Sequence, residues 1–259
     1  MGVVNLTPDS FSDGGQFHSP QQAVNFAIRL LDEGADIVDL GAESTRPGAV
    51  LNLGGDEERR RLAPVLEGIL RIRPRTVLSV DTFRASTARF AVENGAQIVN
   101  DVSGMLWDAE MSGVCAEIRC GVVVMHTRGL PSEWASQPPL AQSQVLPEVL
   151  RGLSQALDRA RHAGVSAQSI VIDAGFGFGK RGAENLTLLR QLAELHSLGY
   201  PLLVGLSRKG FLAPAVAPAD RLAATVAANT AAIFAGAHLL RVHDVAAARQ
   251  AAAIADALL

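Results

Sequence analysis

The sequence predicts an α/β protein, a single (β/α)8 TIM barrel spanning residues 1–259, and three observations predict it. Eight short apolar runs alternate strictly with eight longer amphipathic runs along the chain. A length of 259 residues suits one barrel domain. Hydrophobic residues make up 48% of the chain and aromatic residues only 5%. The core must therefore consist mostly of Ala, Val, Leu and Ile, which parallel strands and their covering helices favour.

The short apolar runs predict strands, and the longer amphipathic runs between them predict helices. The expected strands are Gly2–Val4, Ile37–Leu40, Thr76–Val80, Gln97–Val99, Val122–Met125, Ile170–Ile172, Leu202–Gly205 and His238–Val242. The expected helices are residues 20–33, 56–72, 84–94, 108–118, 144–163, 183–197, 219–235 and 244–258. An open doubly wound sheet is the alternative arrangement of these same units.

Local signals support several of these boundaries. Ser19 followed by Pro20 is typical of a helix start, with serine as the N-cap and proline at the first helical position. Gly34, Gly95 and Gly164 fall where a helix C-terminus favours a left-handed residue, as does Gly199. The loop over residues 127–143 is expected to lie at the surface with modest functional weight.

Polar residues follow every predicted strand. In chain order they are Asn5, Asp39 with Glu43–Arg46, Asp81, Asn100 with Asp101, His126, Asp173, Ser207–Lys209, and Arg241 with His243. Any one of these side chains could be a helix cap, but capping does not explain all eight. The carboxyl ends of parallel barrel strands converge on one mouth, so these side chains are expected to share one cavity.

The opening run Met1–Gly15 forms one wall of this expected cavity. Its strand ends at Asn5 and is followed by a polar loop with Pro8 and two glycines, about fourteen residues long before the helix begins. An ordinary βα connection needs only about 2–6 residues. The extra length predicts an active-site loop.

The charges at the mouth predict the class of ligand. Arg46, Arg208, Lys209 and Arg241 are cationic, as is His243 when protonated, and such a set favours a diphosphate or a carboxylate. A second set, Asp81, Asn100 and Asp173, suits a heterocycle whose edge carries an amino group and ring N–H groups.

Metal ligands are sparse in the sequence. There is no cluster of His and Cys residues and no H-E-x-x-H motif, so a zinc site is not expected. The amide oxygen of Asn5 would suit Mg2+, which keeps most of its waters and takes other ligands from substrate phosphates.

The run Asp173–Lys180 resembles a nucleotide motif but fails on spacing. It reads G-x-G-x-G-K, which is neither a dinucleotide fingerprint nor a P-loop. Its glycines are expected to let the backbone lie close to a flat ligand beside Phe178, although a tight βα turn is the simpler alternative. The run Gly205–Phe211 follows the seventh strand, where barrel enzymes often bind anions, and is expected to open a short helix.

Composition excludes several other classes. A net charge of −3 gives no electrostatic footprint for nucleic acid. No run approaches 18 uninterrupted apolar residues, and no signal peptide is recognisable. Cys115 and Cys120 are expected to be reduced thiols. The protein is expected to be soluble and cytoplasmic.

Eight segments together resemble the dihydropteroate synthase family. They are MGVVNLTPDSFSDGG, DLGAESTRPGA, SVDTFR, NDVSG, VVVMHTRG, DAGFGFGK, GLSRKGFL and RVHDV, in family order over nearly the whole chain. The resemblance implies a transferase of folate biosynthesis. Such an enzyme condenses 6-hydroxymethyl-7,8-dihydropterin diphosphate with p-aminobenzoate, giving 7,8-dihydropteroate and diphosphate with the help of Mg2+.

The resemblance also implies roles for individual residues. Asn5 would ligate Mg2+, while Thr45, Arg46, Arg241 and His243 would contact the diphosphate. Asp81, Asn100, Asp173 and Lys209 would hold the pterin, and Met125 and Phe178 would line its pocket. Gly205 and Ser207 are also expected to bind substrate. Of all these, Arg46, Lys209, Arg241 and His243 are expected to be catalytic. Two loops, Asp9–Gly15 and Ser44–Gly48, would close over the second substrate.

The resemblance further implies a homodimer, for which the Ala-rich helices Asp220–Ala235 and Ala246–Leu258 are candidates, although both could simply pack on the barrel. Three departures from the family stand out. The extra residues that family members commonly carry before the Met-Gly strand are not in this sequence, Ala174 replaces a frequent proline, and Gly210 replaces a frequent serine near the p-aminobenzoate carboxylate. Two other functions compete: a methyltetrahydrofolate-binding module of corrinoid methyltransferases, and a catalytically silent relative.

Overall fold

The computed structural model describes residues 1–7, 19–46 and 48–259. Its centre is one sheet of eight parallel strands in the sequential order β1 to β8. The strands are β1 (Gly2–Asn5), β2 (Ile37–Gly41), β3 (Val77–Asp81), β4 (Ile98–Asp101), β5 (Gly121–Met125), β6 (Ile170–Asp173), β7 (Leu202–Val204) and β8 (Leu239–Leu240). Each overlaps one predicted strand.

The chain closes the sheet into a barrel just beyond β8. Val242 forms a parallel bridge with Gly2, the Val3 amide donates to the Val242 carbonyl at 3.0 Å, and the Val242 amide donates to Met1 at 2.9 Å. The predicted strand His238–Val242 is therefore divided: Leu239 and Leu240 pair with β7, whereas Val242 pairs with β1. Closure confirms the barrel over the open sheet.

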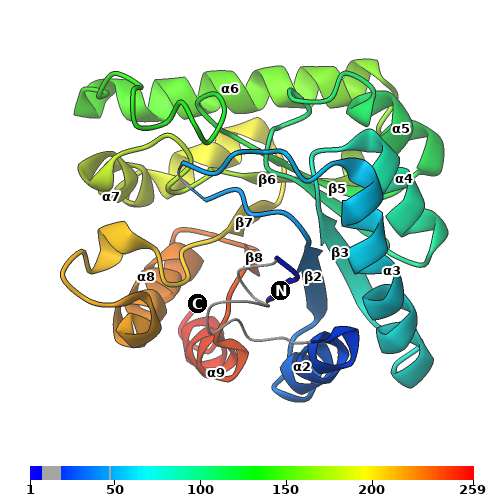
Figure 1. The fold of residues 1–259 in the computed structure, drawn as a ribbon. Helices are drawn as coiled ribbons and strands as arrows, with labels where there is room; N and C mark the ends of the chain where they lie inside the picture. Colours follow the sequence, from blue (N-terminus) through cyan, green and yellow to red (C-terminus); the bar gives the residue numbers. More distant parts are fainter. Residues whose placement is uncertain (8–18, 47) are drawn as a thin grey trace.

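Helices surround the strands on the outside (Figure 1). They are α2 (Pro20–Asp32), α3 (Gly55–Ile72), α4 (Ala85–Glu93), α5 (Met111–Ile118), α6 (Gln142–His162), α7 (Gly182–Arg190), α8 (Leu222–Phe234) and α9 (Val245–Asp256), with short 3-10 helices η1 (Ala167–Ser169), η2 (Leu192–Leu198), η3 (Gly210–Leu212) and η4 (Pro218–Asp220). None of the helices in the described residues is long and apolar enough to cross a membrane.

The single helix predicted over residues 183–197 is wrong in its second half. The α-helix ends at Arg190, and η2 follows as a 3-10 helix that ends before Gly199, whose φ is 77°. Leu192 and Leu195 are both fully buried. Their spacing of three residues places them on one face of a 3-10 helix, so the core is still covered after the α-helix ends.

The register of the sheet sets the height of the functional side chains. Asn5 pairs with Gly41, Gly41 with Asp81, and Asp81 with Asn100, so these residues form one row across the first four strands. On the opposite side, Met125 pairs with Asp173. Strand ends are thus aligned at the carboxyl mouth, and the barrel presents their polar side chains at one level.

Candidate active site

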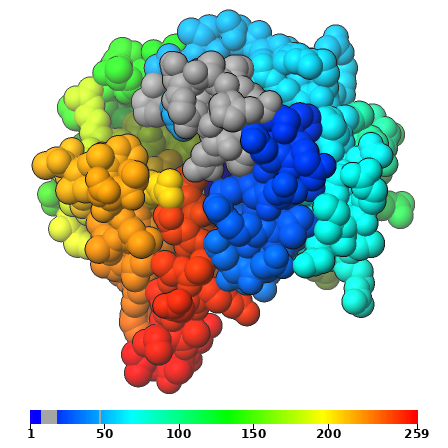
Figure 2. All heavy atoms as spheres, turned by 60° about the horizontal axis from the view of Figure 1, so that its bottom comes forward, coloured from blue at the N-terminus to red at the C-terminus, as the bar shows by residue number. Residues whose placement is uncertain are grey.

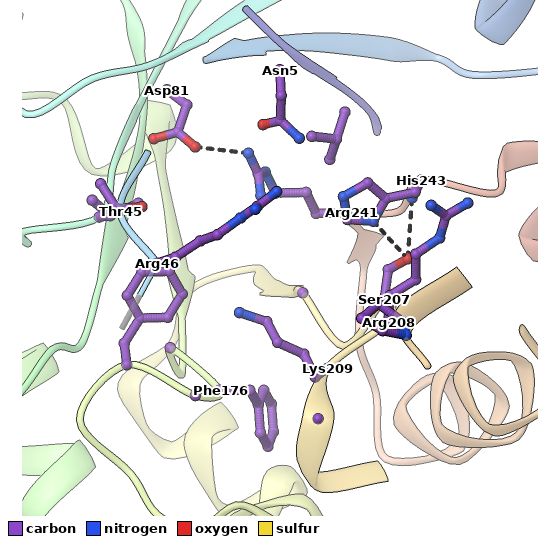
Figure 3. A pocket seen from close by; sticks show the side chains of 18 of the residues that line it. Asn5, Thr45, Arg46, Asp81, Phe176, Ser207, Arg208, Lys209, Arg241 and His243 are labelled. Atoms are coloured by element: carbon purple, nitrogen blue, oxygen red, sulfur yellow. Dashed lines mark hydrogen bonds and ion pairs between the residues drawn. The ribbon is translucent and has the colours of Figure 1, made fainter. Parts of the chain in front are cut away.

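A cavity of about 1050 Å³ opens at this mouth. Side chains and loops from all eight strands line it (Figure 3). It contains every predicted site residue: Asn5, Thr45, Arg46, Asp81, Asn100, Met125, Asp173, Phe178, Gly205, Ser207, Lys209, Arg241 and His243. The structure brings these residues together, while the role of each stays a prediction. Three further residues were also expected to share the cavity, but they are buried and do not line it: Asp39, Asp101 and His126.

Arg241 lies at the centre of a buried charge network. Its Nε donates to Asp39 Oδ2 at 2.7 Å and its Nη2 donates to Asp81 Oδ2 at 2.7 Å. Asn100 Nδ2 also donates to Asp39 Oδ2, at 3.1 Å. Asp39 is completely buried, so it fixes Arg241 and Asn100 from beneath without facing the ligand space. The sequence places Asp39 at a predicted strand end but predicts no separate role for it.

Burial and charge act against each other in this network. Burial raises the pKa of Asp81 to about 7, although Arg241 opposes that rise. Burial alone would lower the pKa of Arg241, but Asp39 and Asp81 outweigh burial and raise that pKa above its ordinary value. Arg241 therefore remains charged, whereas Asp81 can exchange a proton near neutral pH.

Asp173 lies across the cavity from this network. Its Oδ1 accepts a hydrogen bond from the Gly175 amide at 2.7 Å, and burial raises the pKa of its carboxyl group. The side chain is only 6% exposed. One carboxylate oxygen is thus fixed by the backbone, which leaves the other oxygen for a ligand.

Phe178 and Trp134 form an aromatic wall beside Asp173. Their ring centroids are 5.0 Å apart in an edge-to-face arrangement. Trp134 belongs to the loop that was expected to have modest functional weight, but it is buried and lines the cavity. The isolated tryptophan among prolines was the only sequence signal for it.

Two cationic side chains at the mouth, those of Lys209 and Arg46, make no hydrogen bond or ion pair to the residues that the structure describes. The Lys209 ammonium lies 4.5 Å from the centre of the Phe178 ring and makes no hydrogen bond or ion pair to any described residue. Burial, with the charge of Arg241, lowers the pKa of Lys209 to about 8. The guanidinium of Arg46, which is exposed, likewise has no partner in the described parts of the chain. Both cations are available to an anionic ligand.

Arg208 was also expected to face an anionic ligand, but it is paired within the protein. Its guanidinium makes a two-point ion pair with Asp244, Nε to Oδ2 at 3.0 Å and Nη2 to Oδ1 at 2.6 Å. Its backbone has a φ of 58°, which few residues other than glycine adopt. Arg208 therefore joins the loops after β7 and β8, and its charge is already balanced.

Ser207 makes a second connection between these loops. Its hydroxyl lies 3.0 Å from His243 Nδ1 and accepts from the His243 amide at 3.2 Å. Burial and the charge of Arg241 lower the pKa of His243 to about 4. The free protein should thus carry a neutral histidine here, and not the imidazolium that the sequence allowed.

A pH titration should show this directly. We expect the His243 ring signal to change from the neutral to the protonated form with a midpoint at about pH 4. An unfolded histidine has a pKa near 6.5, so the unfolded chain takes up this proton first, and the contribution of His243 to stability falls as pH drops from about 6.5 to 4. NMR of the six histidines, assigned with His243→Gln, tests it; a midpoint above 6 would contradict the structure.

The described residues contain no group of three or more His, Cys, Asp or Glu side chains that could hold a metal ion. Asn5 lines the cavity, and its amide makes no side-chain hydrogen bond to any residue the structure describes. The predicted loop Asp9–Gly15 lies outside the described residues, as does Pro47 within Ser44–Gly48, and closure of either loop stays a prediction.

Known proteins share this chain's sequence and fold. The family model described as "Pterin binding enzyme" matches residues 1–243. Dihydropteroate synthase of Synechocystis is 42% identical over all of this chain and 89% of the relative, and that of Bacillus subtilis is 39% identical over 100% and 88%.

Solved structures of dihydropteroate synthases share the fold of this chain. Xanthomonas albilineans dihydropteroate synthase with 4-aminobenzoic acid is 43% identical, with a TM-score of 0.90 over 100% of this chain and 92% of that one. The Yersinia pestis dihydropteroate synthase, in complex with a sulfonamide drug, is 36% identical with a TM-score of 0.93, over 100% and 93%. The chain therefore belongs to the dihydropteroate synthase family of pterin binding enzymes.

Proposed function

We propose that this chain condenses 6-hydroxymethyl-7,8-dihydropterin diphosphate with p-aminobenzoate, giving 7,8-dihydropteroate and diphosphate in folate biosynthesis. The observation that carries the proposal is that one cavity is lined both by buried Asp173 and Asn100 and by two cationic side chains, those of Lys209 and Arg46, that make no hydrogen bond or ion pair to the described residues. Acceptors suit the donor-rich pterin edge, and cations suit the diphosphate. A family relative from Xanthomonas albilineans has been solved with 7,8-dihydropteroate.

The reaction breaks the bond between the methylene carbon and the diphosphate oxygen and forms a bond from that carbon to the amine nitrogen. The amine then loses one proton to solvent. The cations Arg46, Lys209 and Arg241 would stabilise negative charge as it develops on the departing diphosphate. Asp173 and Asn100 would hold the pterin while positive charge spreads into its ring.

Asn5 would hold Mg2+ in this reaction. A single amide oxygen with no hydrogen-bond partner in the described residues fits an ion that keeps its waters and binds substrate phosphates, and it does not fit a protein-built metal cage. When bound, the ion supplies charge neutralisation at the leaving diphosphate.

Purified protein supplied with both substrates and Mg2+ should form dihydropteroate, measured by product chromatography. Chelation with EDTA should abolish turnover, and excess Mg2+ should restore it. Asn5→Leu should raise the Mg2+ concentration needed for half-maximal rate about tenfold or more, since one direct ligand is lost. A catalytically silent relative would bind the pterin without forming product, and folded protein that gives no product contradicts the proposal.

We also propose that two copies associate through α8 and α9. These helices pack side by side at the surface, drawn in orange and red in Figure 2. They expose large apolar side chains, among them Phe234 at 49% and Ile254 at 66%. Exposed apolar surface of this kind is typical of subunit interfaces. Light scattering should give twice the chain mass, and Phe234→Glu with Ile254→Glu should give the single mass.

A further inference from the structure

Lysine is nearly absent from this chain. Of the 23 lysine and arginine residues, only two are lysines, Lys180 and Lys209, and both line the cavity. Every other basic position carries arginine. A lysine ammonium is compact and can point its three N–H groups in separate directions, whereas the guanidinium of arginine is a rigid plane. These two positions are therefore candidates for a role that arginine cannot fill.

The two lysines have opposite surroundings. Lys209 has no hydrogen-bond partner in the described residues and extends into the cavity. Lys180 donates to three backbone carbonyls: Gly175 at 2.7 Å, and His126 and Phe178 at 3.3 Å each. The side chain is only 6% exposed. An ammonium has three N–H donors, so all of those on Lys180 are used within the protein and none remains for a substrate.

The three carbonyls belong to two different strand connections. His126 follows β5, while Gly175 and Phe178 lie in the glycine loop after β6, which we define as residues 174–180. This loop contacts the end of β5 so closely that a Cβ on Gly175 would be 2.0 Å from the His126 carbonyl oxygen. Carbonyl dipoles that converge in a buried space repel one another unless a donor lies between them.

The glycine loop carries the groups that face the pterin space. Gly175 holds Asp173 through the 2.7 Å hydrogen bond to its carboxylate, and Phe178 packs against Trp134 beneath the Lys209 ammonium. Asn185 of α7 secures the outer side of the loop by accepting from the Gly177 amide at 2.7 Å and donating to the Lys180 carbonyl at 2.9 Å. Two groups link the loop to the connection after β5: the Lys180 ammonium, and Arg128, whose Nη1 donates to the Gly179 carbonyl at 3.1 Å.

We propose that Lys180 is a positioning residue for the pterin: its buried ammonium joins the glycine loop to the end of β5 and thereby fixes Asp173 and Phe178 where the pterin binds. It acts through the backbone and does not touch substrate. The inference rests on the proposed function for the identity of the ligand, but the structural part, a loop held by Lys180, can be measured without any ligand.

The decisive variant is Lys180→Met, which keeps the length of the side chain and removes its three donors. The matched control is Arg190→Met, which removes an exposed cation from α7 without altering the loop. Each is made with Trp107→Phe, so that Trp134 is the one emitting tryptophan of the two in the chain. Pterin affinity is measured by calorimetry with 6-hydroxymethylpterin.

We expect Lys180→Met to weaken pterin binding at least about tenfold and to move Trp134 emission to longer wavelength, while Arg190→Met changes neither. Lys180→Arg should restore little, because a planar group cannot meet three converging carbonyls. Unchanged pterin affinity together with unchanged Trp134 emission in Lys180→Met would overturn the proposal. A shift in emission without pterin binding to the parent protein would instead contradict the proposed function.

A measurement on the unaltered protein covers the case in which Lys180→Met does not fold. With only two lysines, a 15N-lysine spectrum holds at most two side-chain ammonium signals, and Lys209→Arg shows whether a visible signal belongs to Lys180. An ammonium held by three carbonyls should exchange its protons slowly at about pH 5.5 and give a visible signal, whereas the unpartnered Lys209 should not. Absence of a slowly exchanging Lys180 signal would show that the ammonium does not hold the loop.

Discussion

Replacing Arg241 by Ala should lower kcat by about 10²- to 10³-fold, the effect of removing one preorganised donor from a developing negative charge. Arg241 is suited to this role because Asp39 and Asp81 hold its guanidinium in one orientation at 2.7 Å each before any ligand arrives. That orientation needs no rearrangement when the diphosphate departs. Steady-state kinetics with both substrates saturating measures the loss.

Arg241→Lys should recover only a small part of this activity. A lysine carries the charge, but its single ammonium cannot bridge Asp39 and Asp81 while also presenting N–H groups to a diphosphate. Full activity of the Lys variant would show that a point charge is sufficient at this position.

Arg241→Ala should also destabilise the fold, since it leaves two carboxylates without their cation. Removing one partner from a buried ion pair costs about 3–5 kcal/mol, although protonation of Asp81, whose pKa lies at about 7, softens that cost. Arg84→Ala is the matched control, because Arg84 lies between Glu43 and Glu58 at 2.6 and 3.2 Å and does not line the cavity. The control should lose stability and retain most of its kcat. Equal losses of kcat in the two variants would assign the effect of Arg241 to folding alone.

The same charge network shows how far the sequence could predict this site. Apolar runs end at Asn5, Asp81 and Asp173, and the barrel geometry then requires these ends to meet, so their convergence was predictable. The ion-pair partners of the arginines were not predictable from the sequence, because Arg241 and Arg208 are the same residue type and both follow a strand. Only the folded chain shows that Arg208 is balanced by Asp244.

Trp134 and Lys180 were missed for different physical reasons. Trp134 lies in an irregular connection of about fifteen residues, where hydrophobic periodicity gives no orientation. Lys180 ends a glycine-rich motif, and a lysine at such a position usually indicates a phosphate-binding loop. Two of its three carbonyl partners, those of Gly175 and Phe178, lie in a loop with positive φ at its glycines, and the third, that of His126, lies on the connection after β5. The convergence of carbonyls from two connections cannot be predicted from residue spacing.

Asp173→Asn should weaken pterin binding about 10- to 100-fold, the range expected when a hydrogen bond to a charged, buried group is lost. The reason lies in the Gly175 amide, which already donates to Asp173 Oδ1 at 2.7 Å. An asparagine would keep this bond only by placing its oxygen there, and its NH₂ group would then face the pterin. Donor would meet donor, so the substitution would add repulsion to the lost attraction.

A matched substitution separates this effect from a general loss of structure. Asp101 is also a buried carboxylate at the end of a strand, but it accepts from the Ser103 and Met105 amides at 2.8 and 2.7 Å and does not line the cavity. Asp101→Asn should therefore reduce thermal stability and leave pterin affinity within about twofold. Calorimetry with 6-hydroxymethylpterin compares the two variants. If Asp173→Asn binds the pterin as tightly as Asp101→Asn does, the Asp173 carboxylate does not recognise the ligand. The orientation of its second oxygen would then have no effect on pterin binding.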